Sequence, residues 1–338
     1  MFSCNVYSEM IRVEGLTKKF GEVVAIQDVD FDIAEGQTMT LIGTSGSGKT
    51  TLLKMLNRLV EPTEGKIWVN DEPVHNLSLH KLRRKMGYVI QNIGLFPHWT
   101  IARNISTVPR LQGWEKKRIK ERVNEMMEMV QLPPKEYANR YPDALSGGQQ
   151  QRVGLARALA HDPPIILLDE PFGALDPITR RDLQNSFIQL QNRLNKTMVL
   201  VTHDVFEAFK LGSLVCLLDE GKVQQIAAPW DLLHKPANTF VSDFFAGQRL
   251  NLSFQLLKAE DLWPEMKAIA QEQNLEERYG EDLQELTLQA GETLNTLTQD
   301  LEDQPARLHF SEEEASETLV MDLPGVIRAY ERYLENTT

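Results

Sequence analysis

The stretch Gly43 to Thr50, GTSGSGKT, decides how the surrounding chain of 338 residues folds. The apolar run Thr38 to Ile42 before it predicts a short buried strand, and Thr51 to Leu59 after it predicts a helix. In that order the N–H groups of the loop and the positive end of the helix converge on one anion, and glycines leave the space open. We therefore predict a polyphosphate site, against the alternative of an ordinary glycine-rich turn.

Two side chains of this loop carry specific chemistry. Lys49 is expected to place its charge on the β- and γ-phosphates of a nucleotide, and the Thr50 hydroxyl is expected to help hold a Mg²⁺ ion between them. The predicted nucleotide-binding residues of this segment are Gly43, Thr44, Ser45, Gly46, Ser47, Gly48, Lys49, Thr50 and Thr51.

Length and composition suggest about two globular domains, because 42% of the residues are apolar. No apolar run approaches the length of a membrane helix, and the N-terminus has no secretion-signal pattern. The chain itself is therefore not expected to cross a membrane. Its two cysteines, Cys4 and Cys216, are far apart, which favours a reduced, cytosolic protein.

The net charge of −12 is unevenly distributed. From Gly247 onward there are 7 of the 36 basic and 20 of the 48 acidic residues, a net −13, so the first 246 residues carry +1. This shift predicts a domain boundary. A nucleic-acid partner is not expected, because neither part has a basic excess, although local basic patches remain open.

The N-terminal part reads as a short extension, residues 1–10, followed by short antiparallel strands. β-branched residues between Ile11 and Ile33 alternate and are interrupted at Gly15 and Gly21. Phe20 could stack on a purine or could belong to the core. The two readings stay open.

Polar residues follow three further predicted strands. Gln91 follows Gly87 to Ile90 and could reach a metal or a water molecule. Asp169 and Glu170 end the apolar run Ile165 to Leu168, where one carboxylate could orient Mg²⁺ and the other could activate a water molecule. His203 follows Val199 to Thr202 and could contact a γ-phosphate, although a lone histidine is usually a surface residue.

A second glycine-containing loop, LSGGQQ, spans Leu145 to Gln150 and precedes a predicted helix from about Gln151 to Ala160. Small residues and free N–H groups at a helix start form an anion site. A plain glycine-containing cap is the alternative. Between the two loops, GLFPHWTIARNI from Gly94 to Ile105 is apolar and aromatic, which fits either the core of a helical insert or an exposed patch for a partner.

Taken in order, GTSGSGKT, Gln91, LSGGQQ, IILLDEP, the Ala174-Leu175-Asp176 step and His203 resemble the ATP-binding subunit of an ABC transporter, over about Ile11 to Gly247. The resemblance implies an α/β P-loop NTPase (RecA-like) cassette at residues 11–246, with an antiparallel β subdomain and a helical insert at about 92–158. It implies ATP and Mg²⁺ as ligands. It also implies a head-to-tail homodimer, in which the second loop of one copy closes over the γ-phosphate bound by the other.

The resemblance also assigns roles to individual residues. It implies that Phe20 faces adenine, that Asp176 crosses the dimer interface and that His203 supports the γ-phosphate. The implied catalytic residues are Glu170, His203 and Lys49; the implied metal-supporting residues are Thr50, Gln91 and Asp169; the second loop contributes Ser146, Gly147, Gly148 and Gln149.

A finer resemblance links the chain to importers of glycine betaine, choline or carnitine, carried by Lys54 to Gly65, Gly94 to Ile105, Arg140 to Leu159 and Pro171 to Arg180. It implies a peripheral subunit at the cytoplasmic face of the inner membrane, which energises a separate permease fed by an extracytoplasmic binding protein. It places the permease contact at Gly94 to Ile105. Another cargo, such as an amino acid or polyamine, stays open, as does a regulatory ATPase whose tail senses a small ligand.

The acidic tail, residues 247–338, is expected to form a small α/β domain. Strands are predicted at Leu286 to Leu288, Arg307 to Phe310 and Thr318 to Met321, with a helix over Ala290 to Leu301 and another over Leu323 to Leu334. This order resembles one CBS-like unit. A dimerisation or spacer domain is the alternative.

Overall fold

The computed structural model describes residues 9–91, 94–173, 175–279, 283–289, 293–294, 297–301, 304–312 and 315–337. The chain forms two compact units, the first ending at Val241 and the second running from Ser242 to Thr338. The division falls within helix α11 (Thr239–Ala246), slightly before the expected boundary after residue 246. The charge shift that suggested the later boundary begins only after this helix has ended.

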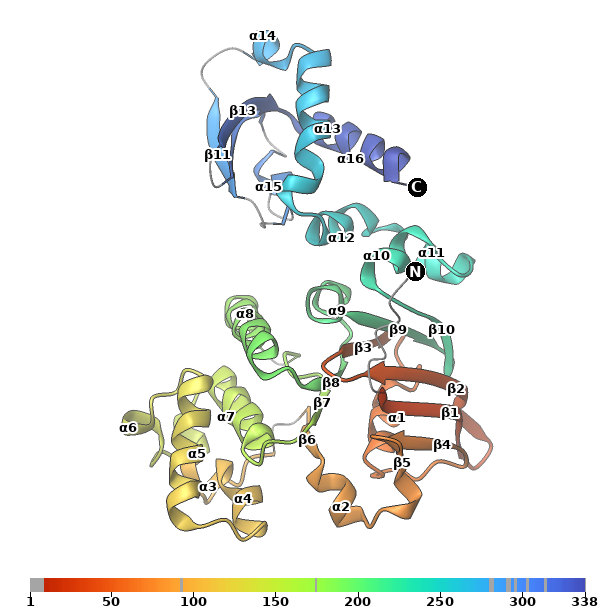
Figure 1. The fold of residues 1–338 in the computed structure, drawn as a ribbon, viewed down its shortest axis with the longest axis vertical. Helices are drawn as coiled ribbons and strands as arrows, with labels where there is room; N and C mark the ends of the chain where they lie inside the picture. Colours follow the sequence, from red (N-terminus) through yellow and green to blue (C-terminus); the bar gives the residue numbers. More distant parts are fainter. Residues whose placement is uncertain are drawn as a thin grey trace, which may run out of the picture. The chain divides into compact units, whose positions relative to one another are not determined.

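A six-stranded sheet forms the centre of the first unit, in the order β10-β9-β3-β8-β7-β6 (Figure 1). All neighbouring strands are parallel except β10, which runs antiparallel to β9. Successive residues of β7 pack into two different apolar clusters, so both faces of the sheet are buried. The strands are β3 (Thr38–Gly43), β6 (Met86–Val89), β7 (Ile165–Asp169), β8 (Thr197–Val201), β9 (Leu214–Asp219) and β10 (Lys222–Ala227).

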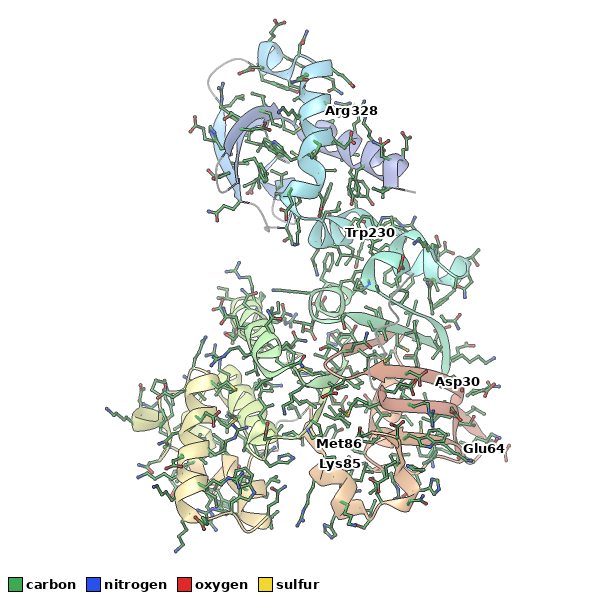
Figure 2. All side chains as sticks on the ribbon, in the orientation of Figure 1. Asp30, Glu64, Lys85, Met86, Trp230 and Arg328 are labelled. Atoms are coloured by element: carbon green, nitrogen blue, oxygen red, sulfur yellow. The ribbon has the colours of Figure 1, made fainter. Side chains whose placement is uncertain are left out.

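A second, antiparallel sheet has the order β2-β1-β4-β5 and consists of β1 (Glu9–Phe20), β2 (Val23–Ala34), β4 (Glu64–Val69) and β5 (Glu72–Pro73). The first two strands are long rather than short. Gly15 does not end β1 but lies in a bulge, with φ of 55°, and its N–H donates to the carboxylate of Asp30 at 2.7 Å. Asp30, on β2, is labelled in Figure 2. Gly21 does turn the chain.

Strand β1 begins at Glu9, within the segment 1–10 that was expected to be an N-terminal extension. Glu9 and Met10 belong to β1, and Met10 is buried in the core. The interpretation of residues 1–10 as an extension therefore does not hold for these two residues, because Met10 supplies an apolar side chain to the sheet. Residues 1–8 lie outside the described part of the chain.

Helices pack against the sheets of this unit through two apolar clusters. A group from α3 to α7 forms the helical insert and packs on β6, β7 and α8 through one apolar cluster. Among the described residues no helix combines the length and apolarity needed to cross a bilayer. The helices of this unit are α1 (Lys49–Leu56), α2 (Leu79–Arg84), α3 (Ile101–Ile105), α4 (Thr107–Leu111), α5 (Lys116–Met129), α6 (Pro134–Tyr137), α7 (Gly147–Leu159), α8 (Pro177–Leu194), α9 (Val205–Leu211) and α10 (Pro229–His234), with short 3₁₀ turns at Val74–Asn76 and Pro142–Ala144.

The second unit contains a three-stranded sheet in the order β11-β12-β13, with β11 parallel and β13 antiparallel to β12. The predicted order of strand, helix, strand, strand, helix is present. Three preceding helices were not predicted. The elements are α12 (Arg249–Leu256), α13 (Ala259–Glu272), α14 (Leu275–Tyr279), β11 (Gln284–Gln289), α15 (Leu297–Asp300), β12 (Ala306–Glu312), β13 (Ala315–Met321) and α16 (Leu323–Thr337).

The helix predicted over Ala290 to Leu301 was wrong in extent. Only α15 is helical, and Ala290 lies outside the described residues. Thr293 instead forms a β-bridge with Lys258, and the N–H of Leu294 donates to the carbonyl of Leu257. Leu294 is fully buried. Its apolar spacing therefore reflects burial in the core rather than a helix face.

Candidate functional site

The predicted site residues follow four strands of the central sheet. β3 leads into the loop Gly43–Thr50, β6 precedes Gln91, β7 ends at Asp169 and β8 precedes His203. These four strands are neighbours and parallel, so their carboxyl ends share one edge of the sheet. Ligands of open parallel sheets bind at that edge.

The glycines of the first loop permit a backbone that other residues could not follow. Gly43 has φ of 142°, and a Cβ there would come within 1.8 Å of the carbonyl oxygen of Leu218. At Gly48, with φ of 97°, a Cβ would lie 2.4 Å from the carbonyl oxygen of Ala25. A Cβ on Gly46 would have nothing within 4 Å. The loop is therefore closely packed against the protein at Gly43 and Gly48 and open at Gly46.

Lys49, at the start of α1, folds back over the loop. Its Nζ donates to the carbonyl oxygens of Gly43 and Thr44, at 3.0 and 2.7 Å, and to Ser47 Oγ at 3.2 Å. Burial lowers the pKa of Lys49, and the nearby charge of Glu170 opposes this effect. A cation is therefore held directly over the loop that is predicted to bind phosphate.

Asp169 and Thr50 are brought together across the sheet. Thr50 Oγ1 donates to Asp169 Oδ1 at 3.1 Å, and the Tyr88 hydroxyl, from β6, donates to Asp169 Oδ2 at 3.4 Å. Burial raises the pKa of Asp169, while the hydrogen bond from Thr50 lowers it. The carboxylate and the hydroxyl thus form one oxygen-rich pair at the carboxyl end of β7.

Glu170 points away from this pair and is the centre of a second group. Its Oε2 accepts a hydrogen bond from Gln91 Nε2 at 2.8 Å and lies 3.6 Å from His203 Nδ1. Glu170 has φ of 47°, a conformation rare for a residue with a side chain, and its N–H donates to the carbonyl of Val201 on β8. The turn after β7 therefore directs two successive carboxylates to different neighbours.

The second glycine loop caps helix α7 in a reciprocal manner. The N–H of Gln149 donates to Ser146 Oγ at 3.3 Å, and the N–H of Ser146 donates to Gln149 Oε1 at 3.0 Å. Gly147 is exposed with free space around its Cα, whereas a Cβ on Gly148 would lie 2.4 Å from Thr179 Cγ2. The helix begins at Gly147, four residues before the predicted start at Gln151.

Within one copy of the chain this second loop stays apart from the first. Among the described atoms, no hydrogen bond or ion pair joins Ser146–Gln149 to Gly43–Thr50. In Figure 1, α7 lies with the helical insert while α1 lies beside β1 and β2. The structure therefore assembles the strand-end residues in one copy, while Ser146 and Gly147 of the second glycine loop are exposed.

Two other predicted residues are also exposed. Asp176 caps α8 by accepting a hydrogen bond from the N–H of Thr179 at 3.1 Å, and this bond lowers the pKa of Asp176. Phe20, at the end of β1, is 51% exposed, and Lys18 Nζ lies 4.8 Å from its ring centroid. The core alternative for Phe20 is therefore wrong. Ala174 lies outside the described residues.

Sequence reasoning missed two residues of this region. Tyr88 contacts Asp169, and Asp219, at the end of β9, accepts a hydrogen bond from Thr44 Oγ1 at 2.6 Å. The position of Asp219 at a strand end was a signal of the kind used for Gln91. The neighbour relationship of β9 and β3 was not visible, however, because about 175 residues separate them.

The oxygen donors at this edge fit a magnesium ion that is shared with a ligand. Among the described residues, no group of three His, Cys, Asp or Glu side chains could hold a metal by itself. Thr50, Asp169 and the amide oxygen of Gln91 are hard donors, and Mg²⁺ commonly binds one carboxylate together with substrate phosphates and water. The residues present therefore suit a metal that arrives with a polyphosphate.

Comparison with known proteins identifies the class to which this fold and site belong. The family model described as ABC transporter matches residues 26–173. The osmoprotectant import ATP-binding protein OsmV of Salmonella typhimurium is 47% identical over 265 residues, which is 77% of this chain and 69% of that protein. The chain belongs to the ABC transporter family, as one of its ATP-binding subunits.

Two other relatives have names of the same kind. The glycine betaine/carnitine/choline transport ATP-binding protein OpuCA of Bacillus subtilis is 51% identical over 71% of this chain, and the match spans 63% of its own length, slightly under two thirds. The glycine betaine uptake system ATP-binding protein YehX of Escherichia coli is 49% identical over 74% of this chain and 81% of its own.

Solved structures agree with the fold. A dimeric ATP-binding cassette in a post-hydrolysis state, bound to ADP and Pi, has a TM-score of 0.59 and 36% identity, and covers 65% of this chain and 98% of its own. The CbiO1 subunit from Clostridium perfringens shares the fold, with a TM-score of 0.63 over 74% of this chain and 95% of its own. The predicted α/β P-loop ABC cassette is confirmed, and ATP is the nucleotide of this class.

Proposed function

We propose that this chain is the ATP-hydrolysing subunit of an importer of quaternary ammonium osmoprotectants such as glycine betaine, choline or carnitine. The observation that carries the enzymatic part is the convergence of Lys49, Asp169 and Glu170 at one edge of the sheet. The cargo class rests on relatives that carry such names and are 47 to 51% identical.

ATP would bind over the first loop. Lys49, whose Nζ now contacts loop carbonyls, is free to exchange these contacts for phosphate oxygens, and exposed Phe20 offers a ring face to adenine. Thr50, Gln91 and Asp169 would hold Mg²⁺, which when bound neutralises charge on the β- and γ-phosphates. Residues Gly43 to Thr51 supply the remaining contacts.

Glu170 is the proposed general base. A carboxylate beside the bound phosphate can accept a proton from a water molecule as that water attacks. Gln91 and His203 both contact Glu170 Oε2, which fixes the direction of the carboxylate. We assign His203 to support of the γ-phosphate.

The reaction needs a second copy of the chain. Ser146, Gly147, Gly148 and Gln149 form the start of helix α7, a position at which free N–H groups favour an anion, and both Gly147 and Gly46 of the first loop have open space around them. We propose that two copies pack head to tail, so that this loop covers the γ-phosphate on the partner and Asp176 lies at the interface. Two solved ABC cassettes with a similar fold are described as dimeric, which supports a working unit of two copies.

The permease would dock near the start of the helical insert. Phe96 is 44% exposed, its ring lies 4.4 Å from that of Trp99, and the carbonyl of Gly94 is held by Arg157 at 2.7 Å. A neighbouring groove of about 320 Å³ is lined by residues that include Leu59, Tyr88 and Phe96. Gln91 follows Tyr88 closely in sequence, so a permease segment in this groove would lie near the Glu170 contact.

This assignment implies a peripheral protein at the cytoplasmic face of the inner membrane, with an extracytoplasmic binding protein as an indirect partner. The test is uptake of labelled glycine betaine by proteoliposomes that contain the chain, its permease and the binding protein, with ATP inside. Uptake that requires ATP and fails with Lys49→Ala supports the proposal. ATP-dependent uptake of an amino acid or polyamine instead would correct the cargo.

A regulatory role for the acidic unit is the second candidate, favoured by its separate core and its order of strands and helices. The unit would then sense a small ligand, as a CBS-like module would; a dimerisation or spacer domain without a ligand is the alternative. The test compares the ATPase rate of the whole chain with that of a chain ending after Ala246, each with adenine nucleotides or salt added. It separates a unit that senses a ligand from one that does not. Equal responses would remove the sensing role.

A further inference from the structure

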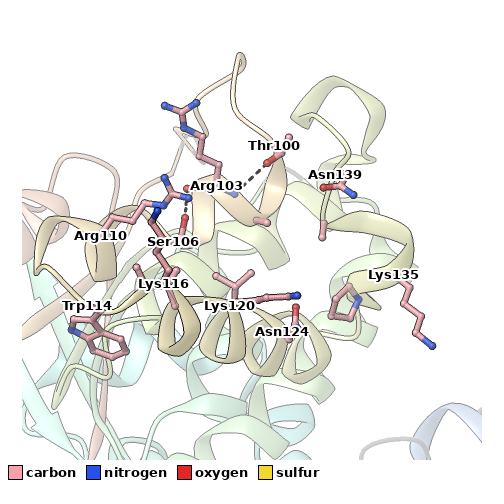
Figure 3. Close-up of a pocket in the computed structure, with 15 residues that line it drawn as sticks. Thr100, Arg103, Ser106, Arg110, Trp114, Lys116, Lys120, Asn124, Lys135 and Asn139 are labelled. Atoms are coloured by element: carbon pink, nitrogen blue, oxygen red, sulfur yellow. Dashed lines mark hydrogen bonds between the residues drawn. The ribbon is translucent and has the colours of Figure 1, made fainter.

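The helical insert contains a pocket of about 830 Å³ that is separate from the nucleotide site (Figure 3). Its walls come from α3 and α4, from α5 and from α6. No residue of the two glycine loops lines it, and none of its lining residues is acidic. Five of them are basic: Arg103, Arg110, Lys116, Lys120 and Lys135.

Helix α5 separates its charges by face. Lys116, Ile119, Lys120, Val123 and Asn124 recur at helical spacing, and all line the pocket. None of the acidic residues of this helix lines the pocket. Two of them, Glu121 and Glu125, line a different hollow together with Arg118 and Arg122. The helix therefore presents cations without carboxylates to this pocket.

Within the described part of the chain, these cations lack acidic partners. Among the described residues, Arg110, Lys116, Lys120 and Lys135 have no carboxylate within 4.0 Å, while Arg103 lies over the ring of Trp99 at 4.3 Å. The first 246 residues, which include this pocket, carry a net charge of only +1, so the pocket is a local concentration of positive charge. Like charges gathered in one concave site repel each other unless an anion is present.

The floor of the pocket is apolar. Ile119 and Val123 are buried, Ala102 and Ala138 add methyl groups, and the ring of Trp114 forms part of the wall. A volume of this size suits a small organic molecule, and such sites pair an apolar lining with a few polar groups. The basic lining residues favour a ligand with a negatively charged group, while the apolar lining residues favour a ligand with an apolar or aromatic body.

We propose that this pocket binds a phosphate-bearing ligand with an apolar or aromatic body. The same chemistry is offered by a soluble phosphorylated metabolite and by an anionic phospholipid. Phosphate oxygens would pair with Arg110 of α4 and Lys120 of α5, and the body would lie on Ile119 and Trp114. This inference does not depend on the cargo or on the catalytic assignments made above.

The test uses the whole chain with saturating Mg²⁺ and ADP, so that the nucleotide site is occupied. One arm titrates 2-naphthyl phosphate against the uncharged 2-naphthol and follows Trp fluorescence. The second arm measures co-sedimentation with phosphatidylcholine vesicles that contain or lack phosphatidylglycerol. Each is repeated with Arg110→Ala/Lys120→Ala and with a control of equal charge change at exposed positions outside the pocket, Lys66→Ala/Lys117→Ala.

We expect at least one phosphate probe to bind, with affinity reduced at least tenfold in Arg110→Ala/Lys120→Ala and less than twofold in the control. Binding of the soluble probe alone assigns a metabolite, and binding of the vesicles assigns a lipid. Equal affinity of the two double variants, or equal affinity for 2-naphthol, would overturn the proposal. Failure of both phosphate probes to bind the wild-type chain would also overturn it. Binding of fluorescent ATP in a separate titration should be the same in all three proteins.

Discussion

The side-chain amide of Gln91 donates a 2.8 Å hydrogen bond to the carboxylate of Glu170. Gln91 follows the edge strand β6 at the point where the helical insert begins, whereas Glu170 follows the neighbouring strand β7. Any displacement of the insert that moves Gln91 therefore weakens or breaks this hydrogen bond to the proposed general base. The contact gives a physical route by which a permease at the insert could affect hydrolysis.

Replacing Glu170 by glutamine should preserve ATP binding and slow turnover by about 10²- to 10⁴-fold, because an amide of similar shape cannot accept the proton. Steady-state ATPase measurement and titration with fluorescent ATP separate the two effects. Glu125→Gln, on an exposed face of α5, is the matched control. Turnover near the wild-type rate in Glu170→Gln would remove this residue from the role of base.

Ser146→Arg should leave ATP binding by the single copy intact and abolish ATP-driven dimerisation, because a long cation would occupy the space of the partner's phosphate. Size-exclusion chromatography with and without ATP, in the Glu170→Gln background, measures this. The variant also loses the cap of α7, at a cost of about 1 kcal/mol. Thermal unfolding should therefore show a small decrease in stability. An unchanged ATP-dependent dimer would contradict the proposed interface.

Gly43→Ala should lower the stability of the protein, whereas Gly147→Ala should lower only its ATPase activity. The Cβ at Gly43 would come within 1.8 Å of a backbone carbonyl, so we expect loss of folding yield or of several °C in melting temperature. Gly147 has open space around it, so its alanine variant should keep monomer stability and ATP binding. In a head-to-tail dimer, however, that alanine would approach the partner's nucleotide and lower ATPase activity. Wild-type activity in a stable Gly147→Ala protein would argue against this arrangement.

Tyr88→Phe should weaken the response to Mg²⁺ without affecting binding of ATP alone. Burial raises the pKa of Tyr88, so its hydroxyl stays protonated and donates to Asp169. Loss of one such bond costs about 1 kcal/mol, equivalent to roughly a fivefold increase in the Mg²⁺ concentration for half-maximal activity. Exposed Tyr141→Phe is the control. A reduced maximal rate at unchanged Mg²⁺ dependence would show that the hydroxyl does not act through Asp169.

Glu207, buried at the start of α9, should make stability decrease with rising pH. Burial raises its pKa from 4.5 to about 7, while hydrogen bonds from Thr202 and from Gln184, at 3.2 Å, oppose the shift. The folded state then binds more protons than the unfolded state between these values, so stability is lost as pH rises through that window, by up to roughly 3 kcal/mol.

Comparing thermal unfolding of the wild-type and Glu207→Gln proteins from pH 5 to pH 8 measures this contribution. The variant should lose less stability over that range, because its amide does not titrate. Asp204 and Arg180 also act on Glu207, with opposite signs, and remain in both proteins. Parallel pH profiles of the two proteins would contradict a raised pKa for Glu207.

The phosphate loop could be predicted from the sequence because its chemistry is local. Gly43 to Thr50 and the flanking strand and helix are adjacent in the chain, and glycine spacing alone indicates an open backbone that can surround an anion. The apolar run before Asp169 likewise indicated a buried strand that ends in carboxylates. Gly15 was misread, because a bulge that strand pairing accommodates has the same sequence signal as a turn.

The sequence by itself determined which residues can bind phosphate, accept a proton or end a strand, because these properties belong to single side chains and short segments. Only the tertiary structure decided which of them meet. Parallel pairing of β6, β7 and β8 placed Gln91, Glu170 and His203 in one group, and packing of α5 against α3 and α6 gathered the basic residues into a pocket. Such contacts join residues far apart in the chain, and they depend on packing that no short segment encodes.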